Sequence, residues 1–163
     1  MMSSNALLHE QAKIVQGLFP ITPSTSVPDY VTLKGAGKLA CIISIDNGAT
    51  VTGTAITLKQ AQAVANTGEK ALAFSTMYAN VDPANTDVLT ETAVTSNTFT
   101  SATTNDANLM YVIYVDPATL DVANGFDCVR VGTGNGVNCV TSVLYVLYPA
   151  NVARANPPSA IAD

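Results

Sequence analysis

The stretch VRVGTGNGVNCV, Val129 to Val140, decides the fold, because its three alternating glycines allow two interpretations. A phosphate-binding glycine loop follows a strand and precedes a helix, whose N-terminal N–H groups bind the anion. The residues after Gly136, VNCVTSVLYVLY, are rich in β-branched and aromatic side chains and favour a strand. In addition, no Lys-Ser/Thr pair follows the glycines, and the third glycine comes too early for a dinucleotide-binding loop. We therefore predict that Gly132, Gly134 and Gly136 form a hairpin connection between two strands.

Strand character continues along most of the chain. LACIISI (39–45) and LMYVIYV (109–115) are apolar on both faces, which is typical of central strands. VLTETAV (88–94) and NTFTS (97–101) are short and polar, which favours exposed or edge positions. Asp116 and Pro117 suit the N-cap and first position of a single helical turn. The other predicted strands are YVTLK (30–34), TAITLK (54–59), ALAFSTMY (71–78), FDCVRV (126–131) and NCVTSVLYVLY (138–148).

Eight or nine short strands separated by turn residues, without βαβ alternation, predict an all-β fold. We expect an antiparallel β-sandwich that is jelly-roll-like, with a short N-terminal helix and an extended arm. The chain has 163 residues, enough to bury a core without disulfides. The predicted organisation is a helix and arm over 1–28, a β-sandwich domain over 29–150 and a flexible C-terminal tail over 151–163.

The N-terminal segment is predicted to be helical over residues 3–19. Ser3 or Ser4 suits the N-cap, and Pro20 and Pro23 end the helix. An apolar stripe then forms from Leu7, Leu8, Val15 and Leu18. Residues 20–28, PITPSTSVP, are expected to be extended. Such an arm could clamp another subunit or fold back onto its own sheet, and the pattern favours neither.

Charge content sets limits on partners. Charged residues make up 12% of the chain, about half of the ~25% typical of soluble domains, and the net charge is −5. The seven Lys and Arg residues are scattered singly, whereas a nucleic-acid-binding surface clusters them, so we expect no nucleic-acid partner. No run approaches the ~20 apolar residues of a membrane span. The N-terminus lacks the basic start and apolar core of a secretory signal, which predicts synthesis in a cytoplasm and no membrane partner.

The three cysteines, Cys41, Cys128 and Cys139, are odd in number and lack C-x-x-C spacing. Each lies in an apolar run, which predicts buried free thiols that behave as small hydrophobic residues. A disulfide between Cys128 and Cys139 stays open as an alternative if their strands pair.

The residues that most often perform catalysis do not form a recognisable set. His9 is the only histidine and lies on the predicted helix without a second ligand nearby. The aspartates are spread over loops, no nucleophile motif occurs and the chain has no Trp to line a glycosidase cleft. We predict no enzyme, no cofactor and no metal site, with a calcium ion among loop Asp and Asn residues as the alternative. Tyr111 and Tyr145 should face the core, with Tyr114 and Tyr148 on the opposite face for packing or sugar binding.

A family resemblance covers most of the chain. The segment LMYVIYVDPATLDVANGFDCVRVGTGNGVNCVTSVLYVLYPANVARA (109–155) resembles small virion proteins encoded beside the major capsid protein of tailed bacteriophages. The likeness lies in the order of an apolar strand ending in VD, a helical turn, a Gly-aromatic step, a VRV strand, a glycine turn and a last strand ending in YP. YVTLKGAGKLACIIS (30–44) and TAITLKQA (54–61) are also similar.

The resemblance implies a capsid decoration, or cement, protein. Members with assigned roles are non-enzymatic β-sandwich or jelly-roll modules on the outer shell, present as trimers or dimers. The expected partners are the major capsid protein and further copies of the chain, and the expected location is the outer capsid surface. A tail or neck component and a sugar-binding, adhesin-like sandwich are the alternatives. The candidate contact residues for a subunit or the capsid are Leu7, Leu8, Val15, Leu18 and Phe19.

Overall fold

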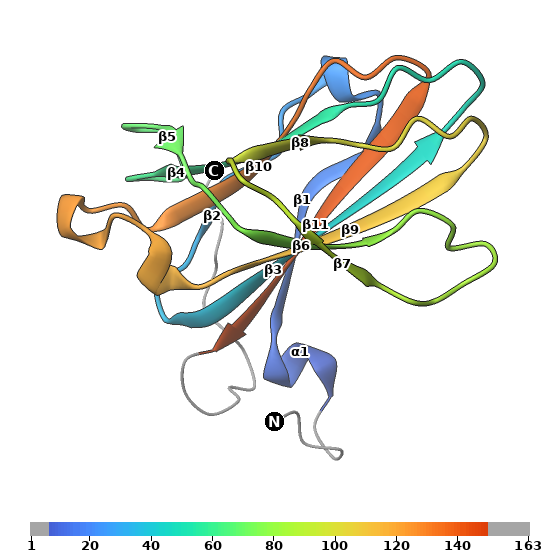
Figure 1. The fold of residues 1–163 in the computed structure, drawn as a ribbon. Helices are drawn as coiled ribbons and strands as arrows, with labels where there is room; N and C mark the ends of the chain where they lie inside the picture. The colour runs from blue at the N-terminus through green and yellow to red at the C-terminus, as the bar shows by residue number, and fades with distance from the viewer. Residues whose placement is uncertain (1–6, 150–163) are drawn as a thin grey trace.

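The computed structural model describes residues 7–149, which form two antiparallel β-sheets packed face to face (Figure 1). Side chains of both sheets meet in one hydrophobic core, as expected of a sandwich. The predicted all-β, antiparallel sandwich is therefore confirmed, and the finer jelly-roll arrangement stays a prediction.

Sheet A has six strands and sheet B has five. In spatial order, sheet A contains β1 (Lys13–Ile21), β11 (Cys139–Pro149), β3 (Ala36–Asn47), β9 (Asn108–Val115), β6 (Thr76–Asn80) and β7 (Thr90–Ala93). Sheet B contains β2 (Val31–Thr32), β10 (Cys128–Thr133), β4 (Ala55–Ala61) and β5 (Lys70–Ala71), with β8 (Thr98–Thr100) also paired to β4. The helical turns are α1 (Leu8–Gln11), η1 (Pro23–Thr25), η2 (Pro117–Thr119) and η3 (Val122–Asn124).

The strand positions follow the hydrophobic pattern. β3 and β9, the two runs that are apolar on both faces, lie side by side inside sheet A, and the polar β7 lies at its edge, as predicted. Asp116 accepts a hydrogen bond from the Ala118 amide (2.9 Å) and caps η2, which is also as predicted.

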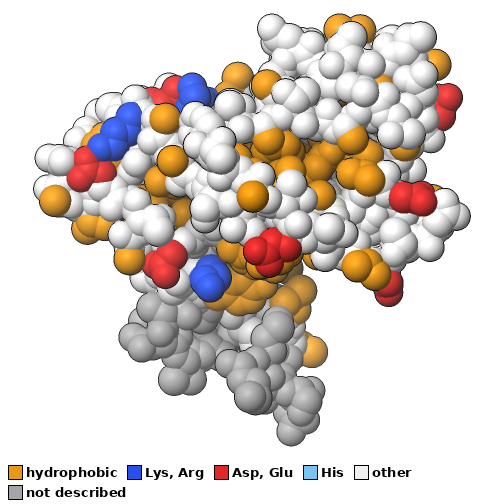
Figure 2. All heavy atoms as spheres, in the orientation of Figure 1, with side chains coloured by type: hydrophobic (Ala, Val, Ile, Leu, Met, Phe, Trp, Pro, Cys, Tyr) orange, Lys and Arg blue, Asp and Glu red, His pale blue; other side chains and the backbone are white. Residues whose placement is uncertain are grey.

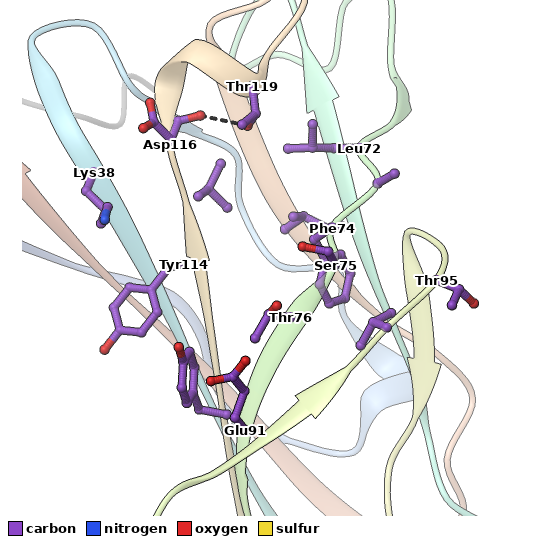
Figure 3. A pocket seen from close by; sticks show the side chains of 15 residues that line it. Lys38, Leu72, Phe74, Ser75, Thr76, Glu91, Thr95, Tyr114, Asp116 and Thr119 are labelled. Atoms are coloured by element: carbon purple, nitrogen blue, oxygen red, sulfur yellow. Dashed lines mark hydrogen bonds between the residues drawn. The ribbon is translucent and has the colours of Figure 1, made fainter.

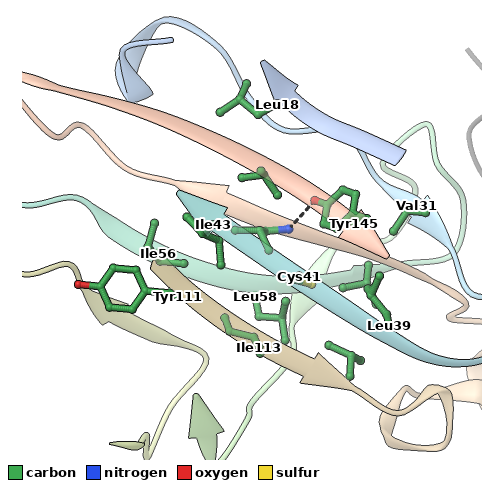
Figure 4. Close-up of a cluster of buried hydrophobic side chains, with 14 of the residues drawn as sticks. Leu18, Val31, Leu39, Cys41, Ile43, Ile56, Leu58, Tyr111, Ile113 and Tyr145 are labelled. Carbon is green, nitrogen blue, oxygen red and sulfur yellow. Dashed lines mark hydrogen bonds between the residues drawn. The ribbon is translucent and has the colours of Figure 1, made fainter. Parts of the chain in front are cut away.

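The core lies between the sheets, where alternate side chains of each strand point inward (Figure 4). Tyr145 and Tyr111 both lie in this core, whereas Tyr114 points away from it, which confirms their predicted orientations. The Tyr145 hydroxyl accepts a hydrogen bond from the Val131 amide of sheet B (3.0 Å) and donates one to the Asp29 carbonyl (3.1 Å). This side chain therefore joins the two sheets by a buried polar contact as well as by packing.

The predicted helix over residues 3–19 is wrong beyond Gln11. Helix α1 ends at Gln11, and Lys13–Ile21 is strand β1, which pairs antiparallel with β11. The β-branched Ile14 and Val15 favour a strand, and the ladder with β11 supplies backbone partners that an isolated helix lacks. The segment thus folds back onto its own sheet. Strand β1 is part of sheet A, although it lies within the region 1–28 that was predicted to be a helix and arm. Ser3, Ser4 and the predicted tail over 151–163 lie outside the described residues.

The glycine-rich segment is followed by a strand, as predicted, but it is not a hairpin. Strand β10 belongs to sheet B and β11 to sheet A, so the connection crosses from one sheet to the other. The glycines are required by close contact with β4: a β-carbon added to Gly132 would lie 2.3 Å from Thr57 Oγ1, and one added to Gly134 would lie 3.0 Å from the Ala55 nitrogen. Larger residues here would push β10 away from β4.

The same crossover decides the cysteine question. Strand β10 pairs with β2 and β4, so the pairing that a bond between Cys128 and Cys139 requires does not form. All three cysteines are free and buried, which confirms the prediction of buried free thiols. Burial, reinforced by the Asp127 side chain, raises the pKa of Cys128 to about 12, so its unreactive thiol form dominates.

Candidate interaction surface

The two outer faces of the sandwich differ in chemistry. On sheet A the side chains that point away from the core form an apolar surface, which we call the outer face of sheet A. Register places Leu144, Ile42, Val112 and Tyr78 in one row across four neighbouring strands. The full set by register on β1, β11, β3, β9 and β6 is Ile14, Gln16, Val140, Ser142, Leu144, Val146, Tyr148, Lys38, Ala40, Ile42, Ser44, Asp46, Asn108, Met110, Val112, Tyr114, Tyr78 and Asn80.

Part of this apolar surface is open to solvent. Tyr114 is 46% exposed and Ile14 is 42% exposed, whereas Val146 and Ala40, which lie between them in the same row, are buried. A sheet face in contact with water normally alternates to polar residues, and contiguous exposed apolar area marks a site of association. In Figure 2, drawn in the orientation of Figure 1, hydrophobic side chains gather in the opening between the strands of sheet B above and β6 and β7 below, and charged side chains stand singly around them.

Charges on the outer face of sheet A lie at its margins. Lys38 and Asp46 occupy the two ends of the outward row on β3, and both are exposed. Within residues 7–149 neither of them takes part in an ion pair.

The outer face of sheet B is polar and internally paired. The Glu69 carboxylate accepts hydrogen bonds from Lys59 Nζ (2.5 Å), Arg130 Nη2 (2.6 Å) and the Tyr30 hydroxyl (2.5 Å). The Arg130 guanidinium also lies over the Tyr30 ring, 4.9 Å from its centroid. Burial opposes ionisation of Glu69, but the hydrogen bonds from Lys59 and Tyr30 and the Arg130 charge lower its pKa overall. This face satisfies its charges itself and suits contact with water.

A cleft of about 710 Å³ opens beside the outer face of sheet A (Figure 3). Strand β6 pairs with β9 only from Tyr78 to Asn80, and the chain before Tyr78 turns away toward sheet B, which leaves a wedge beside the end of β9. The rings of Tyr78 and Tyr114 meet edge to face at its mouth, with centroids 5.7 Å apart. Lys38, Thr76, Glu91 and Asp116 supply polar groups, and Leu72 and Phe74 form the deeper wall.

The contact residues predicted from the sequence are divided by the fold. Phe19 is 74% exposed and Leu7 is 61% exposed, and Leu8 is exposed as well, so these three are accessible to a partner. Val15 and Leu18 are buried in the core, because they lie on the inward face of β1, and their assignment as contact residues is wrong. The outer face of sheet A was missed as a site. Its signal was the apolar character of both faces of 39–45 and 109–115, which we interpreted as typical of central strands; both strands are central, and Ala40 and Val112 on this face are buried.

Other side chains that could take part in catalysis or metal binding have ordinary structural roles. His9 is exposed on α1, and Asp82 accepts a hydrogen bond from the Asn85 side chain in the β6–β7 turn (2.9 Å). Among residues 7–149 no cluster of three or more His, Cys, Asp or Glu side chains has a metal-binding arrangement. In the same range, none of the helices has the length and apolar character needed to cross a bilayer.

Comparisons of the chain with protein-family models, with curated proteins and with solved structures give no match.

Proposed function

We propose that this protein is a non-enzymatic virion structural protein that decorates and stabilises the outer surface of a tailed-phage capsid. The observation that carries the proposal is the contrast between the two faces of the sandwich. An apolar, charge-poor face on sheet A is suited to protein contact, and a self-paired polar face on sheet B is suited to solvent. A surface-bound structural protein requires one face that makes protein contacts and another face that contacts solvent.

The strand β1 supplies the proposed contacts to the major capsid protein. Phe19 stands out from this edge strand, and Leu7 and Leu8 stand out beyond its other end. Pro20 removes a backbone donor from the same edge, which discourages indiscriminate strand addition and leaves side-chain contact as the means of attachment. The acidic net charge of −5 agrees with a position outside the packaged DNA.

The test is attachment of the full chain to capsids that lack it. We expect Phe19→Ser, and separately the pair Leu7→Ser and Leu8→Ser, to reduce occupancy at least ten-fold in a co-sedimentation assay. The matched control is Val122→Ser, because Val122 is also exposed (63%) but lies in η3, close to sheet B. Cryo-electron microscopy of the virion should then place the chain on the shell. If density for the protein occurs only in the tail or neck, it is a tail or neck component and not a capsid decoration protein.

The cleft favours one other function, the binding of a saccharide. Tyrosine rings beside hydroxyl and carboxylate groups can stack on a sugar and accept its hydrogen bonds, and Tyr78, Tyr114, Thr76 and Glu91 provide these groups together. A glycan array probed with the isolated protein tests this function. Reproducible binding that Tyr114→Ala abolishes would support an adhesin-like role over capsid decoration.

A further inference from the structure

The sequence contains three Asn-Gly pairs, and the fold places them in three different environments. They are Asn47–Gly48, Asn124–Gly125 and Asn135–Gly136. An asparagine followed by a glycine can modify itself, because the glycine nitrogen can attack the carbonyl carbon of the asparagine side chain. Glycine permits this ring closure best, since it has no β-carbon to obstruct it. The three pairs share one chemistry, so the fold decides which of them reacts.

The pair Asn47–Gly48 is held at both reacting groups. Asn47 is 2% exposed, and its side-chain nitrogen donates hydrogen bonds to the carbonyls of Ala102 (3.0 Å) and Thr104 (2.9 Å). The Gly48 nitrogen donates to the Asn138 carbonyl (2.8 Å), beside the ladder of β3 and β11. Ring closure at this pair therefore requires several buried hydrogen bonds to break.

The pair Asn124–Gly125 is exposed but is held as well. The Asn124 side-chain nitrogen donates to both carboxylate oxygens of Asp121 (2.9 and 2.8 Å), and the Gly125 nitrogen donates to the Val122 carbonyl (3.0 Å). The negative charge of Asp121 also opposes loss of a proton from a nearby backbone nitrogen. Exposure by itself does not make this pair reactive.

The pair Asn135–Gly136 lies in the connection between β10 and β11 and is not held. Asn135 is exposed, and within residues 7–149 neither its side chain nor the Gly136 nitrogen takes part in a hydrogen bond. Hydrogen bonding resumes at Val137, whose nitrogen donates to Thr52 Oγ1 (3.1 Å). A backbone N–H without a partner in the protein is left to bond with water, and a segment without hydrogen bonds opens locally at little cost.

We infer that Asn135 is a site of spontaneous deamidation in the folded protein, whereas Asn47 and Asn124 are protected. Hydroxide removes the proton of the Gly136 N–H, the nitrogen forms a bond to Asn135 Cγ, and the C–N bond of the side-chain amide breaks. The amide nitrogen takes a proton from water and leaves as ammonia, which restores the hydroxide and leaves a succinimide ring. One water molecule then opens the ring to aspartate or isoaspartate, and either product adds one negative charge to the net charge of −5. This inference goes beyond the proposed function and does not depend on it.

Close packing gives the isoaspartate product a structural consequence. A β-carbon added to Gly136 would lie 2.8 Å from both Cys139 Sγ and Thr54 Cβ, so the backbone has little room at this point. Isoaspartate inserts one extra atom into the backbone immediately before Gly136, whereas aspartate leaves the backbone unchanged. We therefore expect isoaspartate, but not aspartate, to loosen the crossover between the two sheets.

Peptide mapping by mass spectrometry tests the selectivity. The folded, full-length protein is incubated at pH 8 and 37 °C, and Asn135 should deamidate at least ten-fold faster than Asn47 or Asn124. The same incubation in guanidinium chloride removes the fold, and the three rates should then agree within about three-fold. The matched control is Asn135→Gln, which keeps an amide but forms a less favourable ring and should stay unmodified at this position.

Melting temperatures distinguish the two products. Asn135→Asp carries the charge of the product on an unaltered backbone, so it should melt at the temperature of the unsubstituted protein. Incubated protein in which an isoaspartyl methyltransferase assay detects isoaspartate should melt at a lower temperature. If incubated protein melts at the same temperature as Asn135→Asp, the predicted loosening of the crossover is wrong.

The outcomes separate this inference from the proposed function. Equal rates at the three asparagines of the folded protein overturn the inference. A preference for Asn135 that persists in guanidinium chloride also overturns it, because the fold is then not the cause. Attachment to capsids is measured separately with freshly purified protein, so neither result bears on the proposed decoration of the capsid.

Discussion

The aromatic ring of Tyr145 lies directly against the backbone of Gly17, so that a β-carbon added to Gly17 would come within 2.3 Å of Tyr145 Cε2. The contact occurs where the β1–β11 register shifts between Gln16 and Leu18. The ring cannot retreat easily, because it is fully buried and its hydroxyl is held by the Val131 amide and the Asp29 carbonyl. One side chain of β11 therefore fixes the path of β1 and the spacing of the two sheets.

The first prediction concerns this contact. Gly17→Ala should lower the free energy of unfolding by about 1–3 kcal/mol, because the added methyl group overlaps a ring that is held in place. Urea unfolding followed by circular dichroism measures the change. Gly35→Asn is the control, since Gly35 has φ +75° with no atom near its missing β-carbon, and Asn tolerates that conformation. Equal losses in the two variants would contradict the tight contact at Gly17.

The second prediction isolates the Tyr145 hydroxyl. Tyr145→Phe keeps the ring but leaves the buried Val131 amide without its acceptor, which should cost about 1–3 kcal/mol. The half-buried Tyr148 provides the control, and Tyr148→Phe should change stability by no more than about 0.5 kcal/mol. Thermal unfolding of the two variants under identical conditions gives the comparison. A neutral Tyr145→Phe would show that the hydroxyl does not link the sheets.

The third prediction assigns the glycine-rich segment to packing. Gly132→Ala should destabilise the protein by about 1–2 kcal/mol, because the new methyl group meets Thr57 Oγ1 at 2.3 Å. Thr57→Ala removes that oxygen and leaves only ordinary contacts beyond 3.7 Å. In the Thr57→Ala background the same glycine substitution should therefore cost less than about 0.5 kcal/mol. A double-mutant cycle measures the coupling, and strict additivity would refute it.

The fourth prediction is a pH dependence centred on Glu69. Its pKa is lowered in the folded protein, so its contribution to stability is present above the unfolded pKa of about 4.3 and is lost as the pH falls through the lower folded value. Glu69→Gln should reduce stability at pH 7, and its difference from the unsubstituted protein should shrink between about pH 5 and 3. Chemical unfolding across this range measures it. Glu91→Gln, at an exposed position, is the control and should leave the pH dependence of the free energy of unfolding unchanged. A constant difference at all pH values would exclude Glu69 as the cause.

The fifth prediction concerns the thiols. Cys41, Cys128 and Cys139 are buried, and burial raises the pKa of each, so none should react with a disulfide reagent at pH 8 while the protein is folded. Three equivalents should react after unfolding in guanidinium chloride, and a reductant should leave the melting temperature unchanged. Fewer than three reactive thiols in the unfolded, unreduced protein would reveal a disulfide.

Part of the candidate site could have been anticipated from the sequence. The alternation that sends Tyr145 and Tyr111 inward sends Tyr148 and Tyr114 outward, and periodicity alone gave these directions. Periodicity did not show how far the outward residues of β3 and β9 are covered, because a strand that is apolar on both faces has the same pattern whether it is covered or open. Lys38 and Asp46 lie at the two ends of one face of β3. This placement also depended on a strand without interruption across residues 38–46.

The sequence by itself determined the local structure: extended strands with period-two alternation, buried thiols, the η2 cap at Asp116, and a strand after the glycines. Tertiary structure decided which strands pair. It made Lys13–Ile21 a strand of sheet A, carried the glycine segment from one sheet to the other and buried Val15 and Leu18 while leaving Phe19 exposed. The physical reason is that local preferences are short-range and weak, whereas a strand ladder satisfies backbone groups and buries side chains only when distant parts of the chain meet.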